Sequence, residues 1–170
     1  QLHGEVTEVA ERKELLREAE RAARRGADLT GQLLAFSRKS QLLPEPASID
    51  QIVKDVKPLI LRLLGEKHNL EFRIAKDTPL IDVDLAKLQA VLMNLILNAR
   101  DAMVDGGTIK FHAEPSYALK NRTLSIKIAD KGTGIEPGIL PQVFDPYFTT
   151  KPVGKGSGLG LSMAKGFVEQ

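Results

Sequence analysis

Two asparagines and an aspartate lie at helical spacing near the middle of this 170-residue chain. Within the segment Leu92–Ala102, a helix would place Asn94, Asn98 and Asp101 on one stripe. The flanking residues are apolar, and a buried amide without a partner costs about 1–3 kcal/mol. An amide oxygen is a hard ligand that suits Mg²⁺ when the ion also carries water and phosphate. The alternative is a polar stripe that faces solvent.

A second motif follows a segment of alternating hydrophobicity, at residues 130–135 (Asp-Lys-Gly-Thr-Gly-Ile). A carboxylate at the end of a strand can accept a hydrogen bond from an exocyclic amine. The two glycines let the backbone turn and approach a flat ligand. A glycine-rich surface turn is the alternative interpretation.

A third motif, at residues 154–161 (Gly-Lys-Gly-Ser-Gly-Leu-Gly-Leu), offers backbone amides and the positive end of a following helix to phosphate. Lys151 and Lys155 add positive charge there. No GxxxxGK[ST] pattern occurs, which excludes a P-loop, and no βαβ unit precedes the glycines, which argues against a dinucleotide fold. The aromatic segment 143–151 predicts a mobile lid pinned by its apolar base, or a small satellite core.

The helices and strands that position these motifs are predicted from the spacing of apolar residues and from the prolines that end helices. Residues 11–40 carry a seam at steps of four and three that predicts a bundle helix, so we expect residues 1–43 to be a helical docking or dimerisation element. Pro44 and Pro46 end it and predict a hinge over residues 44–47. Residues 48–170 then form a mixed α/β domain with helices on one face of a sheet.

Within that domain, a helix is expected from a cap at Ser48 or Asp50 to Gly65, with Leu59 and Leu63 on its buried face. A second helix should begin at Asp84 and end at Met103. The remaining elements are strands over 69–75, 108–113 and 123–129 and a last helix over 159–170.

The composition narrows the function classes. The chain has no cysteine, which excludes disulfides and thiolate metal sites, and its net charge of +2 does not favour a nucleic-acid partner. Its apolar runs are too short to span a bilayer, so we expect no membrane contact from this segment. A cytoplasmic location fits these features, and any membrane anchor of a parent protein would lie outside this chain.

Together, the three motifs and the aromatic segment resemble the N, G1, F and G2 boxes of the histidine kinase catalytic domain. That domain belongs to the Bergerat or GHKL ATPase superfamily, with type II topoisomerases, Hsp90 chaperones and MutL proteins. The resemblance implies an α+β fold, a two-layer α/β sandwich that binds ATP and Mg²⁺ between the N-box helix and a lid. Residues 31–39 look like the end of the second helix of a kinase dimerisation hairpin.

The resemblance also implies roles for individual residues. Asn98 would ligate Mg²⁺ with Asn94 beside it, and these two are the catalytic candidates; Asp130 would accept a hydrogen bond from the adenine amino group. Lys151, Lys155 and the backbone after them would hold the phosphates. The whole expected nucleotide-binding set is Asn94, Asn98, Asp101, Ala102, Asp130, Gly132, Gly134, Ile135, Tyr147, Thr150, Lys151, Lys155, Gly156, Ser157, Gly158, Leu159, Gly160 and Leu161.

The residue four positions before the magnesium asparagine distinguishes hydrolases from kinases within this superfamily. Hydrolases of the superfamily carry a glutamate four residues before the magnesium asparagine, as the base that activates water. This chain has Asn94 there, and a neutral amide cannot accept that proton. A kinase needs no such base, because its nucleophile comes from elsewhere. The position therefore favours a kinase over an ATP hydrolase.

The family's phosphoacceptor histidine, which is followed by an acidic residue, is not expected in this chain. His3 precedes Gly4, while His68 and His112 lie inside the catalytic domain. The expected acceptor is thus upstream, and the family's two further strands would follow Gln170. The implied function is transfer of the ATP γ-phosphoryl to that histidine for relay to a response-regulator receiver domain, by a homodimer formed through the helical stalk. An ATP hydrolase and a nucleotide-sensing adaptor without phosphotransfer remain the alternatives.

Overall fold

A computed structural model describes residues 12, 14–16, 43–117, 123–152 and 156–170. The chain divides into two compact units, one of residues 1–40 and 149–157 and the other of residues 41–148 and 158–170. Residues 12 and 14–16 of the first unit are helical, and most of the expected stalk lies outside the described residues. Among the described helices, none is both long and apolar enough to cross a membrane.

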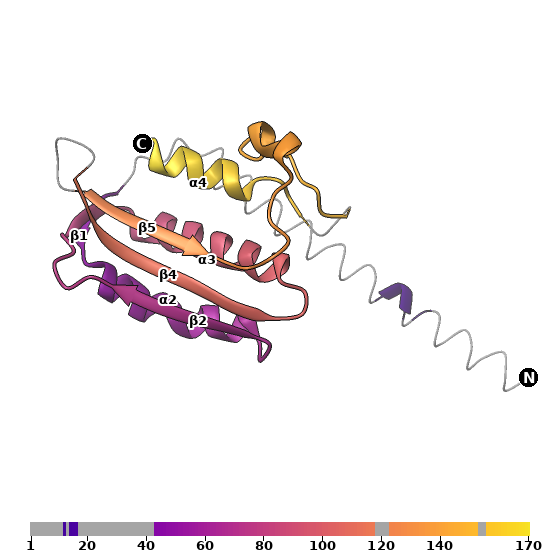
Figure 1. Ribbon diagram of the computed structural model, residues 1–170, viewed down its shortest axis with the longest axis horizontal. Helices are drawn as coiled ribbons and strands as arrows, with labels where there is room; N and C mark the ends of the chain where they lie inside the picture. The colour runs from indigo at the N-terminus through magenta and orange to yellow at the C-terminus, as the bar shows by residue number, and fades with distance from the viewer. Residues whose placement is uncertain (1–11, 13, 17–42, 118–122, 153–155) are drawn as a thin grey trace, which may run out of the picture. The chain divides into compact units, whose positions relative to one another are not determined.

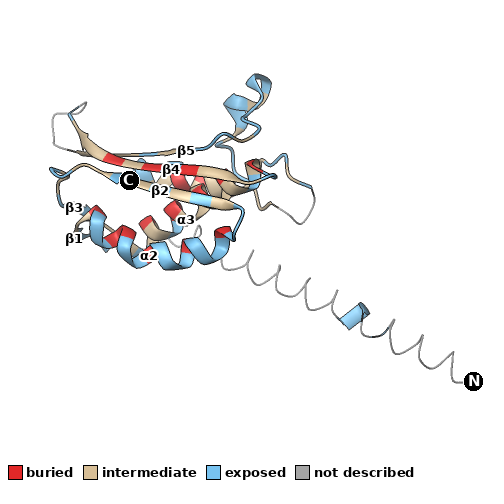
Figure 2. Ribbon diagram, turned by 60° about the horizontal axis from the view of Figure 1, so that its bottom comes forward, coloured by how far each residue is buried: buried red, intermediate tan, exposed pale blue. Residues whose placement is uncertain are grey.

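The second unit is built on a sheet of three strands in the order β2–β4–β5. β2 (His68–Ile74) runs parallel to β4 (Gly107–Ser116), and β4 runs antiparallel to β5 (Thr123–Ala129). The helix α3 (Leu85–Ala102) lies between the two parallel strands in the sequence, since parallel neighbours need a crossover connection. Figures 1 and 2 show α2 (Ile49–Leu64) and α3 on one face of this sheet.

The two helices begin at side-chain caps, as their sequences predict. The Ser48 hydroxyl accepts a hydrogen bond of 3.2 Å from the amide of Gln51, which identifies Ser48, and not Asp50, as the cap of α2. The Asp84 carboxylate accepts one of 3.1 Å from the amide of Lys87 at the start of α3. Such caps satisfy amides that have no partner inside the helix.

The hinge expected over residues 44–47 is a short strand instead. β1 (Glu45–Ala47) pairs antiparallel with β3 (Ile81–Val83), with Pro46 opposite Asp82. Proline cannot donate a ladder hydrogen bond, which a short edge strand tolerates. The two prolines hold this segment extended, and pairing with β3 makes it part of the second unit.

Two groups of buried side chains form the core. Figure 2 shows buried positions on the sheet and on both helices. Phe111 on the central strand is 1% exposed, and its ring centroid lies 5.3 Å from that of Phe72. Leu59 and Leu63 were expected in this core but are 49% and 40% exposed, because they lie on the outer side of α2. The buried members of the two groups are Ile49, Ile52, Val53, Leu88, Leu92, Phe111 and Ala113, and Val56, Ile60, Leu64, Ile96, Ala99, Met103 and Ile109.

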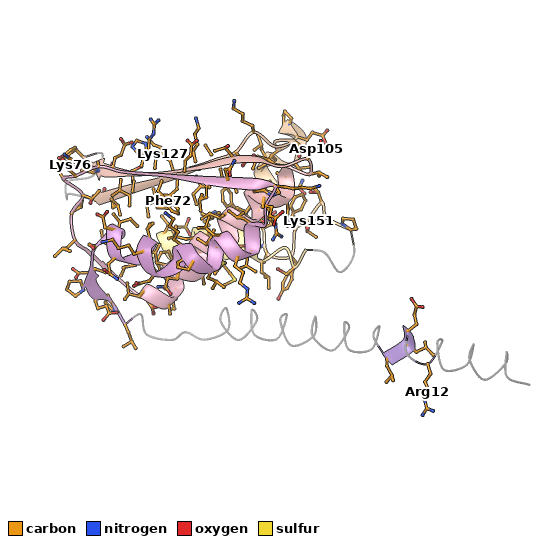
Figure 3. All side chains as sticks on the ribbon, turned by 90° about the horizontal axis from the view of Figure 1, so that it is seen from below. Arg12, Phe72, Lys76, Asp105, Lys127 and Lys151 are labelled. Atoms are coloured by element: carbon orange, nitrogen blue, oxygen red, sulfur yellow. The ribbon has the colours of Figure 1, made fainter. Side chains whose placement is uncertain are left out.

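The opposite face of the sheet carries polar side chains, as strand alternation requires. Lys110 and Lys127 are exposed there, whereas the intervening residues of the same strands face the core. In Figure 3, Lys127 points away from the helices, while Phe72 lies between the sheet and the helices. A hollow of about 250 Å³ on this polar face contains none of the expected nucleotide-binding residues.

Two further elements follow the sheet. The 3₁₀ helix η1 (Pro137–Gln142) was not predicted from the sequence; it has proline at its first position and again at Pro141. The expected last helix is α4 (Gly160–Val168), shorter at both ends than the predicted range 159–170. The expected mixed architecture with helices on one sheet face is present in the second unit.

Candidate functional site

The three polar residues of the expected stripe lie on α3 but differ in their surroundings. Asn94 and Asn98 are half-buried, while Ile96 and Ala99 beside them are buried in the core and fix that side of the helix. The Asn94 amide makes no hydrogen bond to any part of the chain that the structure describes. Asn94 thus places a half-buried carboxamide on the flank of a well-anchored helix.

Asp101 is held by its neighbour in the sequence. Its Oδ1 accepts hydrogen bonds from Nε and Nη2 of Arg100, at 2.9 and 2.6 Å. Nη1 of Arg100 also donates to the carbonyl of Leu63 at the end of α2, at 2.9 Å. Arg100 therefore turns away from the asparagine stripe, as its helical position predicts, and draws the Asp101 carboxylate with it. Nucleotide binding by Asp101 stays a prediction, and this contact weakens it.

The loop after β5 lies against the end of α3. The Asp130 carboxylate accepts a hydrogen bond of 2.8 Å from the Gly132 amide, and the Thr133 amide donates to the Ala102 carbonyl at 3.1 Å. A methyl group on Gly132 would lie 2.6 Å from both the Cβ and the carbonyl oxygen of Ala102, so only glycine fits there. Two motifs 30 residues apart in the sequence thus meet, and Asp130 is oriented by the turn that it closes.

The rest of this loop is open. Gly134 has φ 71°, a conformation that glycine adopts without strain, and Ile135 is 48% exposed. The backbone amide of Thr133, which bonds the loop to α3, was not among the predicted site residues. Its position between two glycines was the only sequence signal for it.

The aromatic segment is less buried than a lid with an apolar base requires. Phe144 is 46% exposed and Tyr147 60% exposed, and Tyr147 has φ 67°, which is unusual for a residue other than glycine. Nζ of Lys165 on α4 lies 5.9 Å from the Phe144 ring centroid. A methyl group on Gly158, which has φ 68°, would come within 2.6 Å of the Tyr147 Cα. This segment is therefore held at the backbone, by glycine contact, and not by a buried aromatic base.

The start of α4 brings Gly160, near the end of the third motif, to the asparagine stripe. Leu159 is fully buried, and its carbonyl accepts hydrogen bonds of 2.9 Å from the Ser162 hydroxyl and the Met163 amide. Gly160, the next residue, faces the Asn94 carboxamide directly: a methyl group on Gly160 would lie 2.7 Å from Asn94 Cγ. No side chain caps the first turn of α4. Leu161, also in that turn, is half-buried.

Four residues of the expected nucleotide-binding set belong to the first unit: Thr150, Lys151, Gly156 and Ser157. The Thr149 hydroxyl accepts a hydrogen bond of 3.2 Å from the Lys151 amide. A methyl group on Gly156 would lie 2.7 Å from that hydroxyl and 3.1 Å from Lys151 Cβ. Lys151 and Gly156 thus lie side by side across the loop. Lys155 lies outside the described residues.

Mg²⁺ fits these residues only as an ion shared with a nucleotide. Within the described ranges, no three His, Asp or Glu residues gather to hold a metal ion. Asn98 offers one amide oxygen, and Mg²⁺ in nucleotide sites typically takes few protein ligands and completes its shell with phosphate oxygens and water. The donor set is therefore compatible with Mg²⁺-ATP and unsuited to an ion bound by protein alone.

Comparison with known proteins identifies the family. Residues 83–170, which include α3, the Asp130 loop and α4, match the family described as histidine kinase-, DNA gyrase B-, and HSP90-like ATPase. The chain belongs to this family. The match covers the helices and loops in which Asn94, Ala102, Gly132 and Gly160 come together.

The similar proteins are sensor kinases. Sensor kinase CckA of Brucella abortus is 40% identical over 159 residues, which cover 87% of this chain and 17% of that protein. Sensor histidine kinase ZraS of Salmonella typhimurium is 32% identical over 168 residues, 98% of this chain and 34% of that protein. The chain thus spans about a sixth of the first relative and about a third of the second.

A solved structure agrees on the fold. The mycobacterial sensor histidine kinase MprB superimposes with a TM-score of 0.61 at 25% identity, over 75% of this chain and 79% of that one. The predicted family and the predicted α+β sandwich of this ATPase type are both confirmed. The family match includes the region of Asn94 and Asn98, whose individual roles remain predictions.

Proposed function

We propose that this chain is the ATP-binding catalytic region of a sensor histidine kinase, which binds Mg²⁺-ATP and transfers its γ-phosphoryl to a histidine upstream of residue 1. The observation that carries the proposal is the meeting of α3 and α4. The first turn of α4 has no side-chain cap, and its first residue lies against the Asn94 carboxamide. Uncapped helix amides attract phosphate, and amide oxygens suit Mg²⁺.

Each part of the site then has a task in the transfer. Asp130, oriented by the Gly132 amide, accepts a hydrogen bond from the adenine amino group. Asn98 contributes an oxygen to the metal shell, and bound Mg²⁺ neutralises charge on the phosphates. Phosphate binding by Lys151 and the Gly156 amide, which belong to the first unit, stays a prediction. Phosphoryl transfer depends mainly on positioning and electrostatic stabilisation, so these residues need no covalent role.

The chemistry at Asn94 favours a kinase over a hydrolase. The transfer breaks the bond between Pγ and the bridging oxygen of ADP and forms a bond from Pγ to an imidazole nitrogen. Water could compete as the nucleophile, but an amide at position 94 cannot take its proton. We propose that Asn94 helps position the nucleotide without promoting hydrolysis.

The partners of the whole protein follow from this role. We propose a homodimer formed through the helical stalk of residues 1–43, and relay of the phosphoryl group to an aspartate on a receiver domain. The relatives named above are sensor kinases, which supports both partners. This catalytic region would act in the cytoplasm, where ATP is supplied.

The proposed activity is tested by labelling from γ-labelled ATP in a longer chain that includes the upstream helix. We expect an acid-labile, base-stable label on that helix, which disappears when Asn98 is replaced by alanine. Steady phosphate release without a labelled protein would identify a hydrolase. Binding of ATP with neither product would identify a nucleotide-sensing adaptor.

The metal-ligand role of Asn98 has its own test. We expect Asn98→Ala to weaken Mg²⁺-ATP binding at least about tenfold, or ~1.4 kcal/mol, by calorimetry. Gln89→Ala is the matched control, because it removes an amide from the same helix about 180° away at about 100° per residue. Equal affinity of Asn98→Ala and wild type would remove Asn98 from the site.

A further inference from the structure

The space between α3 and α4 is filled at one point by the Asn94 side chain. A methyl group on Gly160 would overlap the amide oxygen and nitrogen of Asn94 and lie 2.7 Å from its Cγ. Cβ atoms essentially never approach another heavy atom within 3.0 Å. The Asn94 carboxamide therefore occupies the volume that any side chain at position 160 would need.

Glycine is needed at position 160 because the Asn94 carboxamide fills the space that a side chain would take. The backbone conformation at this position does not itself require glycine. The glycines with positive φ in the described part of the chain include Gly158 at 68° and Gly134 at 71°, but not Gly160. Gly160 is the first residue of α4, in a conformation that alanine adopts readily. A change to alanine there would thus act through the contact with Asn94 and not through backbone strain.

The helix on which Gly160 sits is firmly placed. Leu159 is fully buried just before it, and Ala164 one turn later is 7% exposed. The Ser162 hydroxyl and the Met163 amide both donate to the Leu159 carbonyl. Because α4 is anchored on both sides of Gly160, a methyl group at this position would displace the Asn94 amide more readily than the helix.

No hydrogen bond to the described residues orients the Asn94 amide, although it is half-buried. Packing against Gly160 therefore limits its side-chain rotation. An amide held by packing alone keeps its oxygen and nitrogen available to a ligand.

We propose that Gly160 is a positioning residue for Asn94: its missing side chain forms the seat that orients the Asn94 carboxamide toward bound Mg²⁺-ATP. This inference rests on the proposed nucleotide-binding function and gives Gly160 a different role from direct phosphate contact. Substitution at position 160 lowers nucleotide affinity through Asn94.

A double-mutant cycle measures this dependence. We expect Gly160→Ala to weaken Mg²⁺-ATP binding about tenfold by calorimetry, and to have little further effect when Asn94 is already alanine. Equal losses in both backgrounds would mean that Gly160 acts on the nucleotide independently of Asn94, which overturns the proposal. Unchanged affinity of the single Gly160→Ala variant would overturn it as well.

A second readout needs no nucleotide. In the free protein, we expect Gly160→Ala to shift the side-chain amide resonances of Asn94 in a spectrum of ¹⁵N-asparagine-labelled protein. Unmoved resonances would show that the seat does not orient Asn94. If wild type failed to bind ATP, the proposed function would fall, while these resonances would still report on the seat.

Gly166 provides the matched control on the same helix. A methyl group on Gly166 would meet no atom within 4 Å. We expect Gly166→Ala to leave both the Asn94 resonances and the ATP affinity unchanged, the latter within about twofold. If Gly166→Ala produced the same effects as Gly160→Ala, the effects would belong to glycine replacement in α4 in general, and the proposal would be wrong.

Discussion

The polar residues of the site differ in whether the protein already uses their hydrogen-bonding groups. Asp101 accepts two hydrogen bonds from Arg100, and one carboxylate oxygen of Asp130 accepts a hydrogen bond from the Gly132 amide. Asn94 has no bonded partner among the described residues. A polar group without a partner in the protein is the one most available to a ligand, which makes Asn94 a stronger candidate than Asp101.

Also at the scale of single residues, the ion pair of Glu114 and Lys127 predicts that the stability of the fold depends on pH. The Lys127 ammonium donates a 2.6 Å hydrogen bond to Glu114, and this bond with the positive charge lowers the pKa of the Glu114 carboxyl below its ordinary value of 4.5. The contribution of this group to stability is therefore present above pH 4.5 and is lost as the pH falls through the lowered pKa.

We expect Lys127→Gln to raise the pKa of Glu114 toward its ordinary value, measured by NMR titration of the side-chain carboxyl at low salt. Lys110→Gln is the control, because Lys110 is an exposed lysine on the same sheet face with no acidic partner within 4.0 Å in the described ranges. A Glu114 pKa that is the same in wild type and Lys127→Gln would contradict the assigned cause.

At the scale of elements, the ends of α2 and α3 are tied together under the Asp130 loop. One ring nitrogen of His68 lies 2.8 Å from the Met103 carbonyl, and the other lies 3.3 Å from the Leu64 carbonyl. Arg100 adds a bond to the carbonyl of Leu63. An imidazole with one N–H donates to only one of the two carbonyls beside His68, and Arg100 supplies a donor to a third carbonyl. These contacts fix the end of α3 on which Gly132 rests.

We expect His68→Ala to lower the free energy of unfolding by about 1–3 kcal/mol, since it leaves helix-terminal carbonyls with fewer donors. Urea denaturation measures this. His112→Ala is the control, because His112 lies on the polar face of the sheet and its 3.9 Å contact with Glu114 is weak. Equal urea midpoints for His68→Ala and wild type would show that the His68 contacts contribute nothing to stability.

At the scale of the whole described domain, one central strand carries the core. β4 pairs with strands on both sides, and its residues Ile109, Phe111 and Ala113 are buried at 0%, 1% and 0% exposure. Both helices rest on these side chains through the two buried groups. The placement of α3, and with it the asparagine stripe, therefore depends on the packing of β4.

We expect Phe111→Ala to destabilise the domain by about 3–5 kcal/mol, through lost burial and the cavity that remains. Tyr117→Ala, just beyond the same strand at 72% exposure, should stay within about 0.5 kcal/mol of wild type. Thermal and chemical unfolding would distinguish the two. A small loss for Phe111→Ala would mean that the core collapses around the missing ring.

Local features of the sequence predicted the long elements well. The caps at Ser48 and Asp84 and the apolar spacing gave α2 and α3 nearly their observed bounds, because these signals act within one or two helical turns. β5 was predicted over its observed range, since its alternation extends over seven residues. The short β1 and β3, with three residues each, offer too few alternations to be recognised, and the prolines at 44 and 46 indicated a break.

The motifs themselves were also visible in the sequence, since the amides, the carboxylate and the glycines lie at short spacings. The residues that these motifs contact in the fold could not be recognised from the sequence. Only the tertiary structure decides that Gly160 rests on Asn94, that Gly132 rests on Ala102 and that Arg100 donates to the Leu63 carbonyl. The physical reason is range: helical periodicity and capping are set by neighbours a few residues apart, whereas these contacts join elements that meet only after the sheet and its helices have packed.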